Sequence, residues 1–399
     1  MKLDGLYYRL KSLTLFRPLL DEPVMSAALS LLQALVRQDG EAALDDWSAL
    51  AERLNAAGTA SLAQWLDDTL KYAETSWARA VELGRELPSS EAAARRDTET
   101  LSALAGLDPA ALRDTLAALL PDAGREAAGS LPLWESGEIL SFEELRGWYQ
   151  EHGTGLFARC RAFLWEAGRL LPVPHPDIPG PEALVGYRQQ RSQVEANTYA
   201  LLSGKQVNNV LLYGNSGTGK SATVKSLLSL PGAEELRLIE IEKSGVAQMP
   251  QLMRMLGGRR QKFILFIDDL AFDQDDLTYG VLKTILEGGL EPRPANVAIY
   301  ATSNRRNLVR QTFSDRAGDE VDLSETIQEK TALADRFGLR IPYLGLSKPE
   351  FLELVERLAA QAGISIPLEE LQARAVRWDV RHPGRSPRSA QQFIASLRV

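Results

Sequence analysis

Residues 214–221, Gly-Asn-Ser-Gly-Thr-Gly-Lys-Ser, have the types and spacing of a loop that holds phosphate groups. An apolar run, 209–213, precedes them and a helix-forming run, 222–230, follows, as such a loop requires. Glycines let the backbone approach an anion closely, and N–H groups at a helix start bind it. We therefore expect a triphosphate site, with the lysine on the β- and γ-phosphates and the last hydroxyl on Mg²⁺, formed by Gly214, Asn215, Ser216, Gly217, Thr218, Gly219, Lys220 and Ser221. The alternative is a glycine-rich turn that matches this spacing by chance.

Two carboxylates follow another apolar run. Asp268 and Asp269 come directly after Phe263–Ile267, which has the composition of a buried strand. Acids at this place are costly without a cationic partner, and Mg²⁺ beside the phosphate loop would supply one. We expect Asp268 to bind the Mg²⁺ together with Ser221, and Asp269 to polarise the attacking water. The alternative is that both are solvated acids at a strand end.

A third apolar run, 299–304, also ends in polar residues. The amide of Asn304 would lie near the γ-phosphate and the water if this run is a neighbouring strand. Thr-Ser-Asn by itself is equally typical of a turn.

Composition limits the elements that position these residues. A chain of 399 residues can form two or three domains with sizeable cores. The net charge of −8 is concentrated in residues 1–170, which contain 17 Lys and Arg and 26 Asp and Glu. This acidic balance argues against a large nucleic-acid footprint there.

The single Cys160 excludes an internal disulfide, and we find no membrane-spanning or signal-peptide pattern, so we expect a cytoplasmic protein without membrane contacts. The histidines and the cysteine lack zinc-ligand spacing, so Mg²⁺ is the metal we expect.

Apolar residues at helical spacing dominate the first part of the chain. They cover residues 24–37, 41–55, 61–84, 108–120 and 155–171, and Ser141–Glu144 has the spacing of a capping box. We therefore predict a helical domain over residues 1–171. The proline-dense segment 172–183 cannot continue a helix and predicts a linker.

After the linker, strand-like and helical runs alternate, which predicts an α/β domain with a parallel sheet over residues 184–346. The expected strands are 209–213, 236–241, 263–267, 297–302 and 340–346. A second capping box, Ser347–Glu350, opens a return to short helices over residues 347–399.

These motifs resemble those of the AAA+ ATPases over about residues 184–399, and more closely a bacterial ATP-binding AAA+ family of unassigned function. The stretches that carry the resemblance are 208–221, 266–272, 301–306, 334–339 and 384–390. The resemblance implies an AAA+ P-loop NTPase fold, with a parallel sheet and a C-terminal helical lid, here preceded by an all-α domain. It also implies binding and hydrolysis of Mg-ATP.

The resemblance extends to single residues. Asn304 corresponds to the sensor-1 residue, and Arg336, before Phe337-Gly338, corresponds to the arginine finger, which stabilises charge on the γ-phosphate. In AAA+ rings a neighbouring subunit supplies the finger, so Arg336 implies a homo-oligomer, commonly a hexamer. From the residues alone, Arg336 could instead form an ion pair with Asp335 or Glu329.

Two further positions come from the same resemblance. Arg388 corresponds to sensor 2, with Arg385 as the competing choice, and a surface arginine at a helix start as the alternative reading of Arg388. Residues 184–187, Leu-Val-Gly-Tyr, lie where AAA+ proteins flank the adenine, although they could equally pack as part of the linker.

The chain departs from the AAA+ pattern in two places. The usual acid pair is Asp-Glu, whereas here the second acid is Asp269, and about an ångström of misplacement of the water can slow a reaction roughly 10²-fold. Residues 242–250 contain no aromatic residue, unlike the loop with which threading unfoldases grip a chain.

We therefore expect an ATPase that remodels or loads a macromolecular partner, recruited by the N-terminal helices; the sequence does not identify this partner. An ATP-binding switch or scaffold with negligible turnover is the alternative, motivated by Asp269. A loader acting on DNA is a narrower option. Several arginines could line a nucleic-acid groove, but such residues are more often solvated or contact phosphates of the nucleotide; they are Arg259, Arg260, Arg305, Arg306 and those of 374–388.

Overall fold

The computed structural model describes residues 2–180, 184–272, 277–288, 291–304, 333–382 and 384–398. The chain divides into two compact units, Met1–Arg159 and Cys160–Val399. In the described part of the chain, no helix is both long enough and apolar enough to cross a bilayer.

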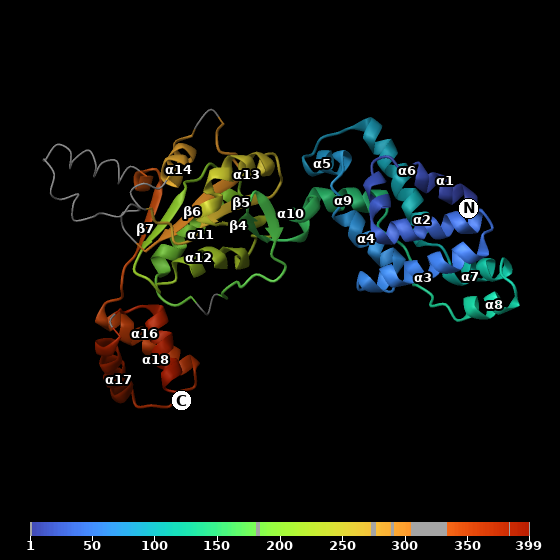
Figure 1. Ribbon diagram of the computed structural model, residues 1–399. Helices are drawn as coiled ribbons and strands as arrows, with labels where there is room; N and C mark the ends of the chain where they lie inside the picture. Colours follow the sequence, from blue (N-terminus) through green and yellow to red (C-terminus); the bar gives the residue numbers. More distant parts are fainter. Residues whose placement is uncertain are drawn as a thin grey trace. The chain divides into compact units, whose positions relative to one another are not determined.

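The first unit is built from helices around one hydrophobic core (Figure 1). Aromatic side chains fill its centre: Trp77 is buried and stacks on Phe142, with 5.2 Å between ring centroids. The predicted helical run 61–84 forms two helices, because Thr75 caps a new helix by accepting from the backbone N–H of Ala78. The helices are α1 (Leu3–Lys11), α2 (Pro23–Val36), α3 (Gly40–Ala56), α4 (Leu62–Lys71), α5 (Ser76–Glu82), α6 (Pro88–Ala105), α7 (Pro109–Ala118), α8 (Asp122–Gly129), α9 (Phe142–His152) and α10 (Gly155–Arg159), with a 3₁₀ turn, η1 (Arg17–Asp21).

Two local features fix parts of this unit. The predicted capping box at Ser141 and Glu144 begins α9. On α6, the fully buried carboxylate of Asp97 holds the turn before η1. Its Oδ2 accepts hydrogen bonds from the backbone N–H groups of Thr14 (2.8 Å), Leu15 (2.8 Å) and Phe16 (3.3 Å).

The second unit contains a seven-stranded sheet with the order β2-β1-β4-β5-β6-β3-β7. Neighbouring strands run parallel except for the antiparallel pair β1 and β2. The five predicted strands all form. The inner strands are largely buried, as in a doubly covered parallel sheet, whereas β7 lies at the edge and alternates in burial. The strands are β1 (Ala162–Glu166), β2 (Arg169–Pro172), β3 (Val210–Gly214), β4 (Leu236–Ile241), β5 (Lys262–Ile267), β6 (Val297–Ser303) and β7 (Leu339–Tyr343).

The prediction of a helix over residues 155–171 is wrong beyond Arg159. Residues 162–172 form the hairpin β1–β2 and belong to the second unit, because β1 pairs with β4 in the sheet. Burial alternates along β1, with Phe163 and Trp165 buried, which is the period of a strand. The turn residues Ala167 and Gly168 both have positive φ, 49° and 76°, as a two-residue hairpin turn requires. The helical unit therefore ends about 12 residues before the predicted boundary at 171.

Helices cover both faces of the sheet (Figure 1). On one face, α11 (Arg188–Leu202) and α12 (Lys220–Ser226) share a core with β3, through side chains such as Val194, Val224 and Leu212. The helices α13 (Met249–Leu256) and α14 (Leu277–Glu287) lie on the other side.

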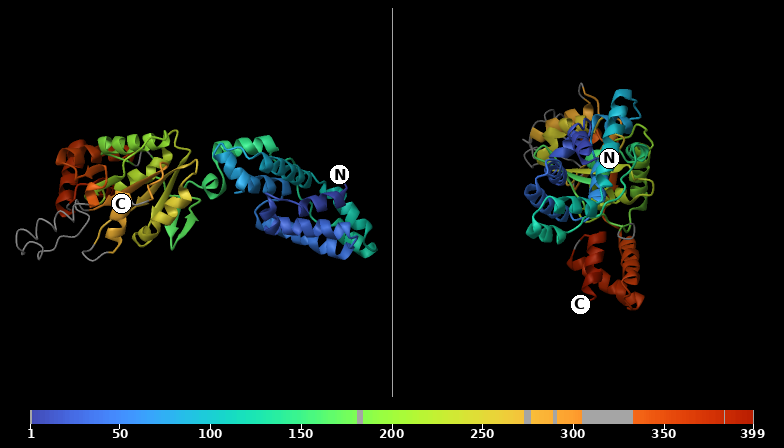
Figure 2. Two further views of the ribbon diagram at one scale, coloured as in Figure 1. Left: turned by 90° about the horizontal axis from the view of Figure 1, so that it is seen from above. Right: turned by 90° about the vertical axis from the view of Figure 1, so that its right-hand side faces the viewer.

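The chain ends in three helices that pack together, drawn in red in Figure 2: α16 (Lys348–Gln361), α17 (Leu368–Arg381) and α18 (Pro387–Ser396). Their own small core includes Phe351, Val355 and Phe393. The predicted capping box at Ser347 and Glu350 begins α16.

Candidate nucleotide-binding site

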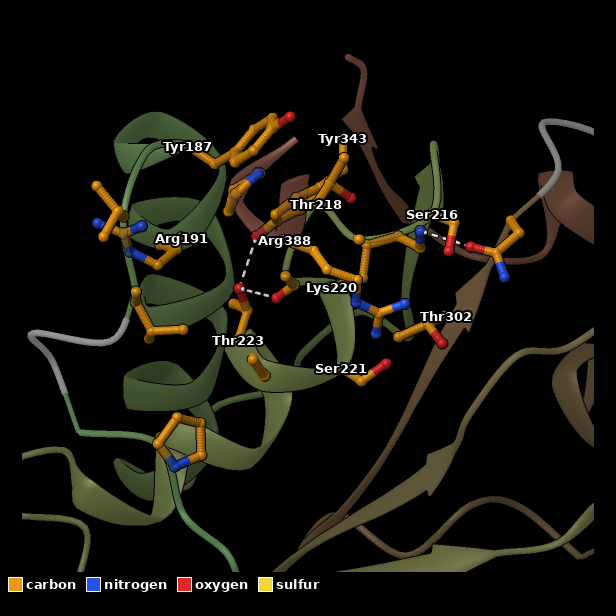
Figure 3. Close-up of a pocket in the computed structure, with 18 of the residues that line it drawn as sticks. Tyr187, Arg191, Ser216, Thr218, Lys220, Ser221, Thr223, Thr302, Tyr343 and Arg388 are labelled. Carbon is orange, nitrogen blue, oxygen red and sulfur yellow. Dashed lines mark hydrogen bonds between the residues drawn. The ribbon is translucent and has the colours of Figure 1, made fainter. Parts of the chain in front are cut away.

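The carboxyl ends of β3, β5 and β6 meet at one edge of the sheet, which is where open α/β sheets bind ligands. A pocket of about 500 Å³ opens there, between the sheet and the last helices (Figure 3). Residues 216–221 form one wall, and Asp268, Asp269, Asn304 and Arg388 contribute to the others.

The loop before α12 has a backbone that only glycine adopts easily. Gly214, Gly217 and Gly219 have φ values of 135°, 74° and 88°. A Cβ atom on Gly214 would lie 2.2 Å from the backbone oxygen of Tyr343, so β7 passes too close for any side chain. A Cβ on Gly219 would meet no atom within 4 Å, so this position faces open space. The loop thus keeps its backbone accessible at the helix start, as phosphate binding requires.

Lys220 is the first residue of α12 and is only 6% exposed. Its Nζ donates to the backbone oxygens of Gly214 (3.1 Å) and Asn215 (2.8 Å) and to Oδ1 of Asn304 (2.9 Å). Burial lowers the pKa of this ammonium group, while the nearby carboxylates of Asp269 and Asp268 act in the opposite direction. The lysine therefore connects the glycine-rich loop to the end of β6.

Short hydrogen bonds join Asp268 to the end of this loop and Asp269 to Asn304. The Ser221 hydroxyl donates to Oδ1 of Asp268 at 2.6 Å, and Nδ2 of Asn304 donates to Oδ1 of Asp269 at 2.8 Å. Asp269 has a φ of 50°, in the left-handed region that few residues other than glycine adopt. The structure thus brings Lys220, Ser221, both acids and Asn304 together from three separate parts of the chain.

Sequence reasoning missed one residue of this group, Thr302. Its hydroxyl donates to Oδ1 of Asp268 at 2.5 Å and accepts from the backbone N–H of Asp269 at 2.9 Å. Thr302 precedes Asn304 by two residues, and alternate residues of a strand lie on the same face. That spacing is the signal that could have identified it.

The last helices contribute Arg388, from the first turn of α18. Its backbone N–H donates to the backbone oxygen of Gly217 at 3.2 Å, and its side chain lines the pocket (Figure 3). The competing candidate, Arg385, instead donates from Nε to Oδ2 of Asp379 on α17 at 2.8 Å. Of the two sensor-2 candidates, Arg388 is the one at the pocket.

Arg336 does not belong to the residues that line this pocket. It precedes β7, and its Nη2 lies 2.8 Å from Oε1 of Glu287 at the end of α14. Asp335, one of the partners considered from the sequence, pairs with Arg340 at 2.6 Å instead. The other, Glu329, lies outside the described residues.

The segment 184–187 contributes to the pocket through Leu184, Val185 and Tyr187. The Tyr187 ring stacks on that of Tyr343, with 4.9 Å between centroids, and its hydroxyl donates to the backbone oxygen of Leu344. Burial raises the pKa of each of these two tyrosines to about 12, so both rings are neutral at physiological pH. The stacked rings and Val185 therefore form an aromatic and apolar wall of the pocket.

The oxygen atoms of Ser221 and Asp268 fit a Mg²⁺ ion that the protein and a phosphate bind together. They are too few for a metal ion that the protein binds alone. In the described part of the chain, no group of three or more His, Cys, Asp and Glu is placed to hold a metal ion. Mg²⁺ binds oxygen ligands, usually one or two carboxylates together with phosphates of the substrate. Ser221 and Asp268, whose oxygens already lie 2.6 Å apart, are such a partial set.

Some arginines considered for nucleic-acid binding are engaged elsewhere. Arg260 forms an ion pair with Glu235 at 2.6 Å, and Arg374 with Glu370 at 2.5 Å. Arg305 and Arg306 lie outside the described residues.

The glycine-rich loop between β3 and α12, the neighbouring strand that ends in acids, and the C-terminal helical lid define an AAA+ P-loop NTPase fold, preceded by an all-α unit. This confirms the predicted fold class. Residues 158–399 match the family described as "Protein of unknown function (DUF815)", and the chain belongs to this family. No curated protein matches the chain.

Solved structures similar to this chain include RuvB of Thermotoga maritima, described as a Holliday junction branch migration motor. It is 16% identical, over 56% of this chain and 64% of that one, with a TM-score of 0.37. A single-substitution variant of the same protein is 16% identical over 54% of this chain and 62% of that one, also with a TM-score of 0.37. This chain therefore spans less than two thirds of the length of these neighbours.

Proposed function

We propose that this protein is a Mg-ATP-dependent AAA+ ATPase that remodels or loads a macromolecular partner. One observation carries the proposal: Lys220, Ser221 and Asp268, from two distant motifs, line a single pocket of about 500 Å³ at the carboxyl edge of the sheet. The Ser221–Asp268 contact at 2.6 Å supports a shared role in holding the metal. The single half-buried cysteine, Cys160, is consistent with the cytoplasmic location that we retain as part of this proposal.

The residues take complementary roles in this proposal. Residues 214–219 and Lys220 bind the phosphates, and Ser221 and Asp268 hold Mg²⁺, which neutralises charge on the phosphate oxygens when bound. Asn304 and Asp269, which contact each other at 2.8 Å, orient the attacking water. Arg388 senses the nucleotide from the lid, and the wall formed by Val185, Tyr187 and their neighbours takes the base.

Arg336 is proposed to act on the pocket of a second copy. It does not line its own pocket and is half-exposed, with only Glu287 as an ion-pair partner among the described residues. A guanidinium group that reaches a γ-phosphate from this position would therefore belong to a homo-oligomer, for which a hexamer is the common AAA+ form.

The first unit is proposed to recruit the partner. Its residues 1–159 carry 15 Lys and Arg against 25 Asp and Glu, so its surface favours a protein partner over a nucleic acid.

Three variants test the ATPase. Lys220→Ala should abolish ATP binding, because it removes the cation that is placed at the phosphate loop. Asp269→Asn should keep binding and stop turnover, and Arg336→Ala should keep binding and slow hydrolysis. Binding is measured by calorimetry and turnover by phosphate release. A wild-type chain that takes up no ATP with or without Mg²⁺ would refute the proposal.

A mixing experiment tests the shared site. Lys220→Ala retains the finger but no working pocket, and Arg336→Ala retains the pocket but no finger. An oligomer that contains both variants has some pockets with all parts, so the mixture should hydrolyse ATP faster than either variant alone. Equal rates in the mixture and in the separate variants would argue against a finger supplied in trans.

A second candidate function is an ATP-dependent switch with negligible turnover. The observation that favours it is the shorter acid at position 269, whose carboxylate is already bonded to Asn304. Tight ATP binding without steady-state phosphate release would support the switch, and a raised rate for Asp269→Glu would show that the side-chain length limits turnover.

A further inference from the structure

Thr302 lies at the end of β6 and is 1% exposed, beside the two acids of the pocket. Its hydroxyl makes two hydrogen bonds, one as donor and one as acceptor. It donates its proton to Oδ1 of Asp268 at 2.5 Å and accepts the backbone N–H of Asp269 at 2.9 Å. One side chain therefore contacts both acids, through the carboxylate of the first and the backbone of the second.

The backbone of Thr302 holds the same turn. Its carbonyl oxygen accepts from the N–H of Leu270 at 2.7 Å. Thr302 thus makes one hydrogen bond to each of three consecutive residues, Asp268, Asp269 and Leu270. These three hydrogen bonds fix the segment that follows β5 against the end of β6.

The hydrogen bond from the Asp269 N–H to Thr302 holds a turn in which Asp269 has a φ of 50°, in the left-handed region that aspartate adopts more often than most residues but that is uncommon outside glycine. In this conformation the carboxylate of Asp269 reaches Nδ2 of Asn304 at 2.8 Å. At Asp269 the left-handed backbone thus accompanies a contact between the short side chain and Asn304.

We propose that Thr302 is a positioning residue that sets both acids of the ATPase site. Its hydroxyl fixes the Asp268 carboxylate for Mg²⁺ and holds the Asp269 backbone in the left-handed turn that compensates for the short second acid. This inference rests on the proposed function and names the residue that makes an Asp-Asp pair competent for turnover.

The test compares Thr302→Val, which keeps the shape and removes the hydroxyl, with Thr302→Ser, which keeps the hydroxyl. Thr198→Val is the matched control. Thr198, on α11, is equally buried and its hydroxyl also makes two hydrogen bonds, but to Val194 and Tyr300 rather than to the acids. Thr302→Ala serves if the valine variant fails to fold, as judged by circular dichroism. Each protein is titrated with ATP by calorimetry in EDTA and in Mg²⁺, and phosphate release is measured across ATP and Mg²⁺ concentrations.

The inference has three expected results. Thr302→Val binds ATP in EDTA within about twofold of wild type, because the phosphate loop is unchanged. The gain in affinity from Mg²⁺ and the kcat both fall about 10- to 100-fold, as is usual when a partner of a metal-binding carboxylate is removed. Thr302→Ser recovers both, and Thr198→Val matches wild type throughout.

The outcomes separate the two proposals. A Thr302→Val protein with wild-type Mg²⁺ dependence and kcat overturns the role of Thr302 alone, as does a serine variant as impaired as the valine one. If wild type binds ATP but does not turn it over, the Mg²⁺ dependence of binding still decides the role of the hydroxyl. A wild-type chain that binds no ATP overturns the proposed function, and the role of Thr302 with it.

Discussion

Replacement of Asp97 by alanine should strongly destabilise the first unit. The carboxylate is fully buried and accepts from the backbone N–H groups of Thr14, Leu15 and Phe16. Thr14 is exposed, so its N–H can bond to water in the variant, whereas Phe16 is fully buried and Leu15 is half-buried. Two donors would therefore lose the one acceptor that they have among the described residues.

The size of the effect follows from these two donors. A buried donor left without a partner costs about 1–3 kcal/mol, so we expect Asp97→Ala to lower the free energy of unfolding by about 4 kcal/mol. Asp97→Asn keeps an oxygen in place but loses its charge. Since bonds to charged acceptors are about twice as strong as neutral ones, it should cost about half as much.

Urea unfolding followed by tryptophan fluorescence measures this change in the full chain. Five of the seven tryptophans report on the first unit: Trp47, Trp65, Trp77, Trp134 and Trp148. Asp122→Ala is the control, because that aspartate is fully exposed and, within the part of the chain that the structure describes, pairs with Arg125 alone, at 3.3 Å. It should leave the transition unchanged. A loss below about 1 kcal/mol for Asp97→Ala would refute the assignment of this carboxylate as the main support of the turn.

Three further predictions follow from other contacts. Gly217→Ala should weaken ATP binding by roughly tenfold, because its φ of 74° is costly for alanine and its Cβ would lie 3.0 Å from Cβ of Arg388. Gly204→Ala is the control, since Gly204 has a φ of 73° but open space around it, and it should lower stability without changing ATP binding. Calorimetry measures the ATP affinity of both variants. Tyr343→Phe should flatten the loss of stability between pH 10 and 12. In this window the unfolded tyrosine ionises while burial, which raises the folded pKa to about 12, keeps the folded one neutral, so stability falls as pH rises. Ser347→Ala should cost about 1 kcal/mol in thermal unfolding of the second unit, because it removes the capping box of α16.

Each of these has a clear contrary result. Equal ATP affinities for the two glycine variants would mean that the approach of Arg388 is unimportant. An unchanged pH slope for Tyr343→Phe would assign the alkaline loss to other groups. An unshifted midpoint for Ser347→Ala would mean that packing alone defines the start of α16.

The parts of the fold that the sequence predicted correctly depend on local patterns. The run Phe263–Ile267 lies within β5, since a buried parallel strand is a continuous apolar stretch. The capping boxes at Ser141 and Ser347 were predictable because both partners lie within one turn of helix.

What could not be predicted depends on pairing across the chain. Thr302 reaches Asp268 because β5 and β6 pair with Ile267 opposite Ala301, a register that no local pattern specifies. The partner of Arg336, Glu287, lies 49 residues earlier, so a search among neighbouring acids found the wrong candidates. The hairpin β1–β2 was missed because its apolar residues also fit a helical spacing, whereas the pairing of β1 with β4 is a contact between distant parts of the chain.

The hairpin β1–β2 determines where a fragment must begin if the second unit is to be produced without the first. A fragment begun at the predicted boundary of 184 would lack β1 and β2 and leave β4 as an exposed edge with a row of unpaired backbone groups, which invites aggregation. A fragment that begins near residue 158, where the family match starts, retains the natural border of the sheet. Expression of both pieces side by side would show whether insolubility of the shorter one reflects this missing strand pair.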